Sequence, residues 1–285
     1  MSRIQEILKK AERDGSVHRT RPIGVDRPVA AAPATAQALA EPPQVIIPAV
    51  PPPAPRAAVA PVVDPRLVAA VAPQSIAAEQ YRSLRTRVTR AENGRALRAL
   101  IITSPNTGDG KSLTAANLAL TMAQEFQQRV LLLDADLRRP SIHRLFGISE
   151  TPGLADVLMG GAVLDDALVT VPDHRLTVLP AGLLPSHPAE LLGSAAMRRV
   201  LDTLRTRFDR ILIDMPPVAP LADVAIASSM ADGVLMIVRA GVTPKPAIER
   251  ALAGIDTAKV IGLVLNDAGE SSTAYRYSGY GYVAG

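Results

Sequence analysis

Five uninterrupted apolar runs mark the C-terminal two thirds of the chain. They occupy residues 99–102, 130–133, 211–213, 234–238 and 260–265, and stretches with helical spacing lie between them. A strand with one face in water alternates apolar and polar residues, whereas a strand covered on both faces is continuously apolar. The runs therefore predict the strands of a doubly wound α/β fold, with a mostly parallel sheet and helices on both sides.

Polar residues end each of these runs. In such sheets, ligands bind beyond the carboxyl ends of the strands. We therefore expect the five endings to converge on one pocket: Thr103 with Ser104, Asp134, Asp214, Arg239 and Asn266.

The first third of the chain has a different organisation. Residues 1–20 hold apolar side chains at helical spacing and predict a short amphipathic helix, which is either a docking element or a frayed end. Residues 21–73 are rich in Pro and Ala and predict an extended linker. A second helix is predicted over residues 75–92, ended by Asn93 and Gly94. This leaves a folded domain at 74–270 and a tail at 271–285.

The amino-acid composition excludes several classes of protein. The 285 residues are 48% hydrophobic, enough for one substantial core, and they contain no cysteine, so any bound metal has oxygen ligands. The sequence shows neither an apolar run of about 18 residues nor a secretory signal, so we expect a cytoplasmic protein. Residues 1–98 hold 15 Lys/Arg against 8 Asp/Glu, while the remainder is slightly acidic and aromatic residues make up only 3%. Nucleic-acid binding is therefore not expected.

A phosphate-binding loop is predicted between the first apolar run and the next helix. Residues 104–112 read Ser-Pro-Asn-Thr-Gly-Asp-Gly-Lys-Ser. The glycines turn backbone N–H groups toward phosphates, Lys111 reaches the β- and γ-phosphates of ATP, and the Ser112 hydroxyl binds Mg²⁺. Pro105 replaces the first glycine of the usual pattern, so the loop alone also fits an ordinary turn. The predicted nucleotide-binding residues are Thr107, Gly108, Asp109, Gly110, Lys111, Ser112, Leu113 and Asn266.

Two acidic strand endings favour the nucleotide interpretation. Residues 134–140, Asp-Ala-Asp-Leu-Arg-Arg-Pro, place two carboxylates and two guanidinium groups together, which is costly unless a metal or a phosphate binds there. Asp214 ends another run, and the prolines that follow it delay any helix, which weakens the alternative of a simple helix cap. We expect Ser112, Asp136 and Asp214 to hold Mg²⁺.

Together these motifs resemble the bacterial tyrosine autokinases of capsular and exopolysaccharide biosynthesis. That family is a branch of the P-loop NTPases that also contains the partition and septum-placing ATPases. Residues 134–140 are similar to its Walker A′ motif and residues 214–217 to its Walker B motif, and the likeness spans residues 75–285. Asn106 stands where a partition ATPase has its signature lysine, which argues against that branch.

The resemblance also implies a subunit contact. Glu79, Arg82 and Arg85 are similar to the motif through which members of the family form homo-oligomers, here in the 75–92 helix. Their spacing alone favours a solvated helix face with internal ion pairs.

The C-terminus carries the predicted phosphate acceptors. Four of the five tyrosines lie in the last eleven residues, among small residues that cannot build a core: Tyr275, Tyr277, Tyr280 and Tyr282. A low-complexity tail is the alternative, but the resemblance implies a cluster that is phosphorylated in trans. It also implies that Lys111 counters γ-phosphate charge, that Asp134 accepts or orients the tyrosine hydroxyl, and that Arg138 or Arg139 neutralises phosphate oxygens.

Partners are implied by the resemblance as well. Residues 1–12 are similar to the start of stand-alone proteobacterial members, whose membrane-spanning chain-length regulator is a separate chain. This implies a cytoplasmic protein held at the inner membrane through that regulator, opposed by a phosphotyrosine phosphatase, and regulating polysaccharide polymerisation and export. A partition-type ATPase switch and a non-catalytic ATP-binding adaptor remain the alternatives.

Overall fold

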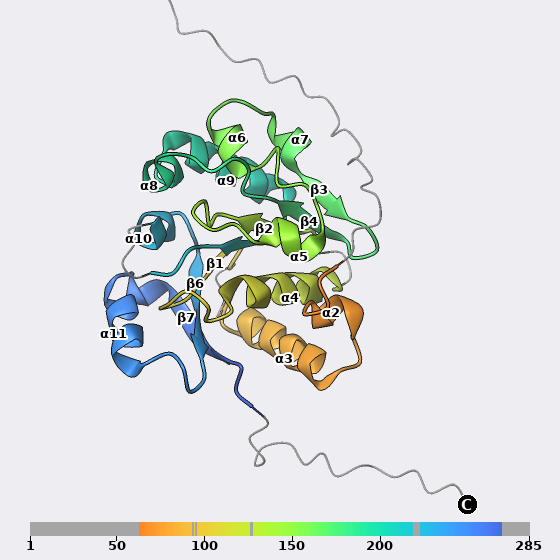
Figure 1. Cartoon of the computed structure of the whole chain (residues 1–285), viewed down its shortest axis with the longest axis vertical. Coiled ribbons are helices and arrows are strands. Elements are labelled where there is room, and N and C mark those ends of the chain that lie inside the picture. The colour runs from red at the N-terminus through yellow and green to blue at the C-terminus, as the bar shows by residue number, and fades with distance from the viewer. Residues whose placement is uncertain (1–62, 93, 95, 126–127, 219–222, 270–285) are drawn as a thin grey trace, which may run out of the picture. The chain divides into compact units, whose positions relative to one another are not determined.

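A computed structural model describes residues 63–92, 94, 96–125, 128–218 and 223–269 (Figure 1). The predicted helix at 1–20, most of the predicted linker and the four tail tyrosines lie outside the described residues. Within the described ranges, no helix has the length and apolar character needed to span a bilayer.

A seven-stranded sheet lies at the centre of the fold, in the order β3-β4-β2-β5-β1-β6-β7. Neighbouring strands pair in parallel, except for the antiparallel pair β3 and β4. The strands are β1 (Ala99–Thr103), β2 (Val130–Asp134), β3 (Val169–Val171), β4 (Leu176–Leu179), β5 (Arg210–Asp214), β6 (Gly233–Arg239) and β7 (Val260–Asn266). The predicted mostly parallel fold is confirmed, with all five predicted strands. Strands β3 and β4 were not predicted, because they are short and partly exposed and hold no long apolar run.

Helices cover both faces of the sheet (Figure 1). One face carries α2 (Val68–Val71), α3 (Ile76–Arg90), α4 (Lys111–Ala123) and α5 (Ile142–Phe146). The other carries α6 (Leu154–Leu158), α7 (Leu164–Ala167), α8 (Pro188–Leu192), α9 (Ala195–Arg207), α10 (Asp223–Ser228) and α11 (Lys245–Ala253). A short 3₁₀ helix, η1 (Thr257–Lys259), precedes β7.

The continuous apolar runs are explained by two cores, one on each side of the sheet. In β2, Leu131 and Leu133 enter the core under α6 and α9, whereas Val130 and Leu132 enter the core under α4. Successive strand residues point to opposite faces, so a strand between two helix layers needs apolar residues at every position.

The folded domain begins earlier than the predicted boundary at residue 74. Leu67 is fully buried, and Val63 packs against the same core. The Ala69 N–H donates to Oδ1 of Asn117 on α4 at 3.0 Å. Residues 63–71 of this Pro- and Ala-rich stretch, which include the short helix α2, therefore pack onto the folded domain.

The last strand corrects the prediction that all five runs are buried on both faces. β7 is an edge strand, and its Leu263 and Leu265 are 52% and 63% exposed. An apolar run does not reveal a strand's position in the sheet, which depends on chain topology.

Candidate nucleotide site

The loop between β1 and α4 forms a cradle at the carboxyl end of the sheet. Gly108 and Gly110 have φ angles of +89° and +93°, a conformation that glycine adopts without steric cost. Because α4 begins at Lys111, its first N–H groups have no partner within the helix and present a favourable dipole to an anion. A cavity of about 510 Å³ is lined by six of the predicted residues: Thr107, Gly108, Gly110, Lys111, Ser112 and Leu113.

The two remaining predicted residues brace this loop from outside the cavity. Asp109 is buried; its Oδ2 accepts from the Asn106 N–H at 2.8 Å and its Oδ1 accepts from the Thr243 hydroxyl at 2.7 Å. Asn266 Nδ2 donates to the Asp109 carbonyl at 3.0 Å. It passes so close to Gly110 that a Cβ atom there would lie 2.1 Å from Nδ2. The loop is therefore tied to the ends of β6 and β7.

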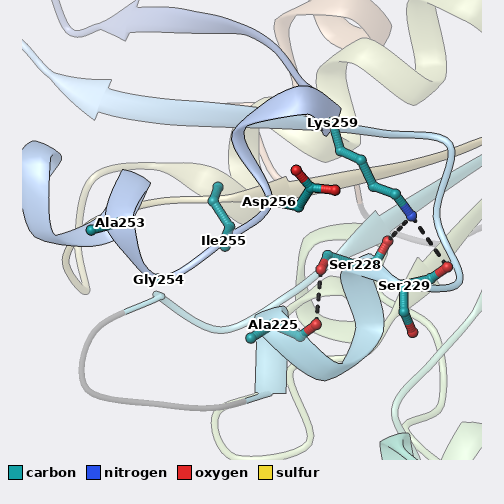
Figure 2. Close-up of a pocket in the computed structure, with 8 residues that line it drawn as sticks. All are labelled: Ala225, Ser228, Ser229, Ala253, Gly254, Ile255, Asp256 and Lys259. Carbon is teal, nitrogen blue, oxygen red and sulfur yellow. Dashed lines mark hydrogen bonds between the residues drawn. The ribbon is translucent and has the colours of Figure 1, made fainter. Parts of the chain in front are cut away.

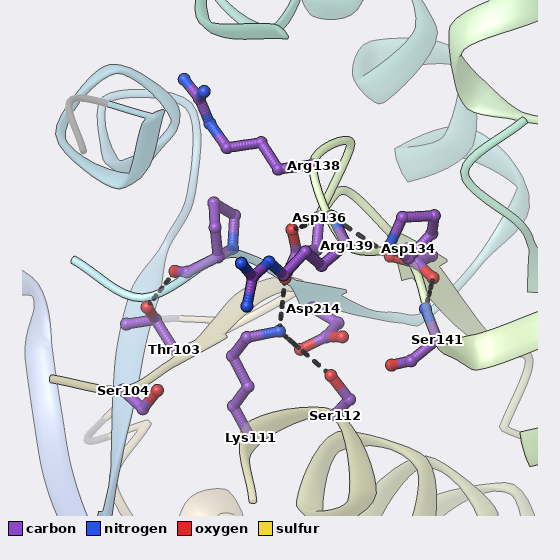
Figure 3. Close-up of polar contacts among 12 residues, drawn as sticks. Thr103, Ser104, Lys111, Ser112, Asp134, Asp136, Arg138, Arg139, Ser141 and Asp214 are labelled. Atoms are coloured by element: carbon purple, nitrogen blue, oxygen red, sulfur yellow. Dashed lines mark hydrogen bonds and ion pairs between the residues drawn. The ribbon is translucent and has the colours of Figure 1, made fainter. Parts of the chain in front are cut away.

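Lys111 lies among the predicted catalytic carboxylates (Figure 3). Its Nζ is 2.7 Å from Asp136 Oδ2, 3.5 Å from Asp214 Oδ1 and 3.0 Å from Ser112 Oγ. Burial lowers the pKa of Lys111, but the charges of Asp214 and Asp136 outweigh burial and raise it. Lys111 therefore carries its positive charge at the point where the predicted metal ligands meet.

The same cluster fits a magnesium ion shared with a nucleotide. Asp214 is fully buried, and its Oδ2 has no hydrogen-bond partner in the described part of the chain. Burial raises the pKa of Asp214, while the charge of Lys111 and the Ser112 hydroxyl oppose the rise. The described residues include no group of three or more His, Cys, Asp or Glu placed to hold a metal. A carboxylate and a hydroxyl completed by phosphate oxygens is the arrangement that Mg²⁺ commonly adopts.

Asp134 lies deeper than the other acids. It is fully buried, and its Oδ1 accepts from the Asp136 N–H at 3.2 Å. Its Oδ2 accepts from the N–H groups of Ser141 and Ile142 at 3.1 and 3.0 Å. Burial and the charge of Asp214 raise the pKa of Asp134 to about 7. Asp136 lines the cavity and Asp134 does not, so Asp134 braces the turn that carries Asp136.

The two arginines of the motif diverge (Figure 3). Arg138 Nε and Nη2 donate to the two oxygens of Asp223 at 2.8 and 3.1 Å, and this pairing raises the pKa of Arg138. Arg139 extends instead over Asp136 toward Lys111. Asp223 was not predicted, because nothing in the local sequence connects it to a motif 85 residues away.

The endings of β1, β2 and β5 lie side by side at the carboxyl edge of the sheet. Asp134 and Asp214 are register partners, and the Thr103 hydroxyl donates to the Pro216 carbonyl at 2.7 Å. The ending of β6 does not reach the cavity, since Arg239 pairs with the exposed Asp267 at 2.8 Å.

The predicted subunit-contact residues are paired within the chain. Arg82 Nε lies 2.6 Å from Glu79 Oε2. Arg85 forms an ion pair with Glu125 at 2.9 Å and donates from Nη1 to the Thr121 carbonyl at 2.9 Å. Arg85 therefore braces α3 against α4, whereas the Glu79 side chain is 68% exposed.

A second depression, of about 530 Å³, lies between α10 and residues 253–259 (Figure 2). Lys259 Nζ donates to the carbonyls of Ser228, Ser229 and Ala231 at 2.6, 3.2 and 3.0 Å. These bonds use all three ammonium protons and close the C-terminal end of α10. Lys259 therefore has no free proton for a phosphate, and we place the candidate phosphate site in the cavity beside the glycine loop.

Comparison with known proteins agrees with this site. The ParA family model, described as NUBPL iron-transfer P-loop NTPase, matches residues 96–269. Tyrosine-protein kinase YwqD of Bacillus subtilis is 36% identical over 218 residues, which cover 76% of this chain and 90% of YwqD. The chain belongs to the bacterial tyrosine-protein kinase family of P-loop NTPases. The family predicted from the sequence motifs is confirmed.

Two further comparisons show which part of the related proteins this chain matches. Putative tyrosine-protein kinase EpsB of Ralstonia nicotianae is 34% identical over 229 residues, which cover 76% of this chain and only 30% of EpsB. The kinase domain of the Escherichia coli tyrosine kinase ETK has a TM-score of 0.70 and 29% identity, covering 80% of this chain and 88% of that domain. The similarity therefore lies in the nucleotide-binding domain.

Proposed function

We propose that this chain is an ATP-dependent protein-tyrosine kinase that phosphorylates its own C-terminal tyrosines in trans. The observation that carries the proposal is the meeting of Lys111, Ser112, Asp136 and Asp214 in one cluster beside the glycine loop. This is the set of groups that phosphoryl transfer from a nucleotide requires. Membership of the tyrosine-protein kinase family supports tyrosine, rather than water, as the acceptor.

Lys111 is the proposed stabiliser of the transferred phosphoryl group. Its side chain is only 11% exposed, so its charge acts in a site with little water and is weakly screened. On ATP binding, Nζ exchanges Asp136 for phosphate oxygens. Magnesium, held by Ser112 and Asp214 with Asp136 in its outer shell, would neutralise charge on the β- and γ-phosphates.

The transfer forms a bond between the tyrosine oxygen and the γ-phosphorus. It breaks the bond from that phosphorus to the bridging oxygen of ADP, and the phenol proton leaves. A pKa of about 7 suits Asp134 as the proton acceptor near neutral pH. Its oxygens accept from three backbone N–H groups, so this role requires the turn at 134–142 to open.

The proposed acceptors are Tyr275, Tyr277, Tyr280 and Tyr282. Each phosphate adds about −1.5 to −2 charges at neutral pH. The carboxylates of Asp136 and Asp214 repel this charge, so a phosphorylated tail leaves the cavity of a neighbouring copy. We propose that phosphorylation thereby loosens an oligomer formed through α3 and regulates polysaccharide polymerisation and export.

The proposed partners are a membrane-spanning chain-length regulator and a phosphotyrosine phosphatase. The likeness of residues 1–12 to stand-alone members of the family supports a regulator on a separate chain. The excess of Lys and Arg in residues 1–98 suits a cytoplasmic protein held beside an anionic inner membrane.

Purified full-length protein with γ-labelled ATP and Mg²⁺ tests this function. We expect phosphotyrosine on residues 275–282, and its loss in Lys111→Ala and in a variant with all four tail tyrosines changed to Phe. The matched control is Tyr81→Phe on α3, which removes the fifth tyrosine and keeps full labelling. Free phosphate without phosphotyrosine would indicate an ATPase switch, and nucleotide binding with neither product would indicate an adaptor.

Transfer between copies has its own test. Full-length Lys111→Ala is mixed with wild-type protein that lacks its last eleven residues. Label on the Lys111→Ala chain requires transfer in trans, and its absence contradicts that part of the proposal. Light scattering before and after phosphorylation then tests the oligomer, since an unchanged mass contradicts the proposed loosening.

A further inference from the structure

We propose that Arg139, and not Arg138, is the arginine that contacts the terminal phosphate of ATP. The inference rests on the proposed use of the cavity for ATP. It assigns Arg139 to phosphate binding and Arg138 to the packing of the Walker A′ turn against α10.

Four cationic side chains line the cavity, at Arg66, Lys111, Arg138 and Arg139. Three of them are paired with a carboxylate at 2.7 or 2.8 Å: Arg66 with Asp64, Lys111 with Asp136, and Arg138 with Asp223. Within the described ranges, the Arg139 side chain has neither a carboxylate partner nor a side-chain hydrogen bond. Arg139 is thus the guanidinium that can meet an anion without first leaving a protein partner.

Arg138 is committed to α10. Its Nε and Nη2 bind both oxygens of Asp223, a carboxylate that is 1% exposed at the first residue of that helix. Turning Arg138 toward the nucleotide would leave a buried carboxylate without its partner, which is strongly unfavourable. Its pairing therefore joins the Walker A′ turn to α10.

Arg139 is aimed at the place where the phosphates belong. Its backbone N–H donates to Asp136 Oδ1 at 3.0 Å, which anchors the residue beside the carboxylate that holds Lys111. The side chain then runs over Asp136 toward Lys111 (Figure 3). Its exposed guanidinium has five donors in a planar fork, which suits two oxygens of one phosphate.

The balance of charges at the site favours a second cation beside Lys111. Asp136 and Asp214 lie beside Lys111, at 2.7 and 3.5 Å from its Nζ, and ATP with one Mg²⁺ remains an anion when it enters. Lys111 is already paired with both of these carboxylates. An unpaired guanidinium at the open side of the cluster offsets charge that Lys111 does not reach.

Measured affinities for nucleotides with and without a γ-phosphate distinguish the proposed roles of Arg138 and Arg139. Calorimetric titrations with Mg²⁺ and either ADP or the non-hydrolysable analogue AMP-PNP are made on wild type, Arg139→Ala, Arg139→Lys and Arg138→Ala. We expect Arg139→Ala to weaken AMP-PNP binding roughly ten- to hundredfold, the loss of a charge-assisted contact, with ADP affinity nearly unchanged. Arg139→Lys recovers part of the difference, because a lysine supplies charge without the fork.

Arg138→Ala is the matched control and should lower the thermal unfolding midpoint while changing both affinities by the same factor. If it does not fold, Arg138→Lys keeps a cation for Asp223 and replaces it. A selective loss of AMP-PNP binding in the Arg138 variant, or an equal or absent effect on both nucleotides in Arg139→Ala, would overturn the assignment. These readouts do not involve tyrosine, so a protein that binds as expected but forms no phosphotyrosine refutes only the proposed function.

Discussion

Asp134 and Asp214 stand opposite each other as register partners at the ends of β2 and β5. Both carboxylates are fully buried, and Lys111 lies beside only one of them, at 3.5 Å from Asp214. Two buried like charges so close together cannot both ionise cheaply. This pair therefore makes the stability of the domain depend on pH.

The first prediction concerns that pH dependence. The pKa of Asp134 rises from 3.8 to about 7 on folding, so the folded protein holds a proton that the unfolded chain has released. The stability this provides is complete below the unfolded pKa and is lost as pH rises through about 7. We expect the free energy of unfolding to fall by about 2 kcal/mol from about pH 5 to pH 7, relative to Asp134→Asn. Urea titrations of both proteins without nucleotide measure this, and parallel curves would contradict it.

A second prediction concerns Lys111 as a counter-ion. Lys111→Met removes the cation that faces Asp136 and Asp214 and should lower the free energy of unfolding by about 3 kcal/mol near neutral pH. The loss shrinks in acid, because burial raises the pKa of Asp214 and this carboxylate becomes protonated. Lys245→Met is the control, since Lys245 is 85% exposed and forms a surface ion pair with Glu249, and its unfolding midpoint should match wild type.

A third prediction separates two glycines of the loop. Both need a positive φ, so alanine at either position costs about 1 kcal/mol of strain. A Cβ atom at Gly108 meets nothing within 4 Å, whereas one at Gly110 collides with Asn266. Gly110→Ala should therefore lower the unfolding midpoint and the ATP affinity more than Gly108→Ala. Adding Asn266→Ala to Gly110→Ala should bring its midpoint close to that of Gly108→Ala; no recovery would show that the collision is unimportant.

A fourth prediction separates folding from assembly on α3. Arg85→Ala removes the ion pair with Glu125 and the bond to the Thr121 carbonyl, and should destabilise each subunit by about 1–2 kcal/mol. Glu79→Ala removes an exposed carboxylate and should leave the unfolding midpoint unchanged. If α3 is the proposed interface, Glu79→Ala lowers the mass measured by light scattering. An Arg85→Ala protein as stable as wild type would refute the bracing role.

Local patterns predicted the centre of the fold well. The sequence predicted strands β1, β2 and β5 because a strand buried on both faces is a continuous apolar run. It predicted their functional ends because a polar residue follows each run directly. Helix α3 begins as predicted, with the Ser75 hydroxyl accepting from the Ala78 N–H at 3.1 Å. The strand-to-helix order then brings Lys111, Asp136 and Asp214 to one place.

Features that depend on distant parts of the chain were not predictable in this way. Asp223 fixes Arg138, and Thr243 fixes Asp109, across 85 and 134 residues of sequence. The edge position of β7 and the packing of Leu67 likewise follow from topology. The sequence likewise does not show which arginine faces the cavity, because that depends on the pairing of Arg138 with the distant Asp223.

The attachment of Asn266 to the nucleotide loop has a consequence for kinetics. Tyr275 follows nine residues later, a length that extends to at most about 30 Å. The tail therefore starts beside the nucleotide loop of its own chain, so transfer within one chain has to be distinguished from the proposed transfer in trans. Dilution leaves the rate per molecule of phosphoryl transfer within one chain unchanged. The rate per molecule of transfer between two chains falls in proportion to the protein concentration. Initial rates over a series of protein concentrations therefore give the share of each route.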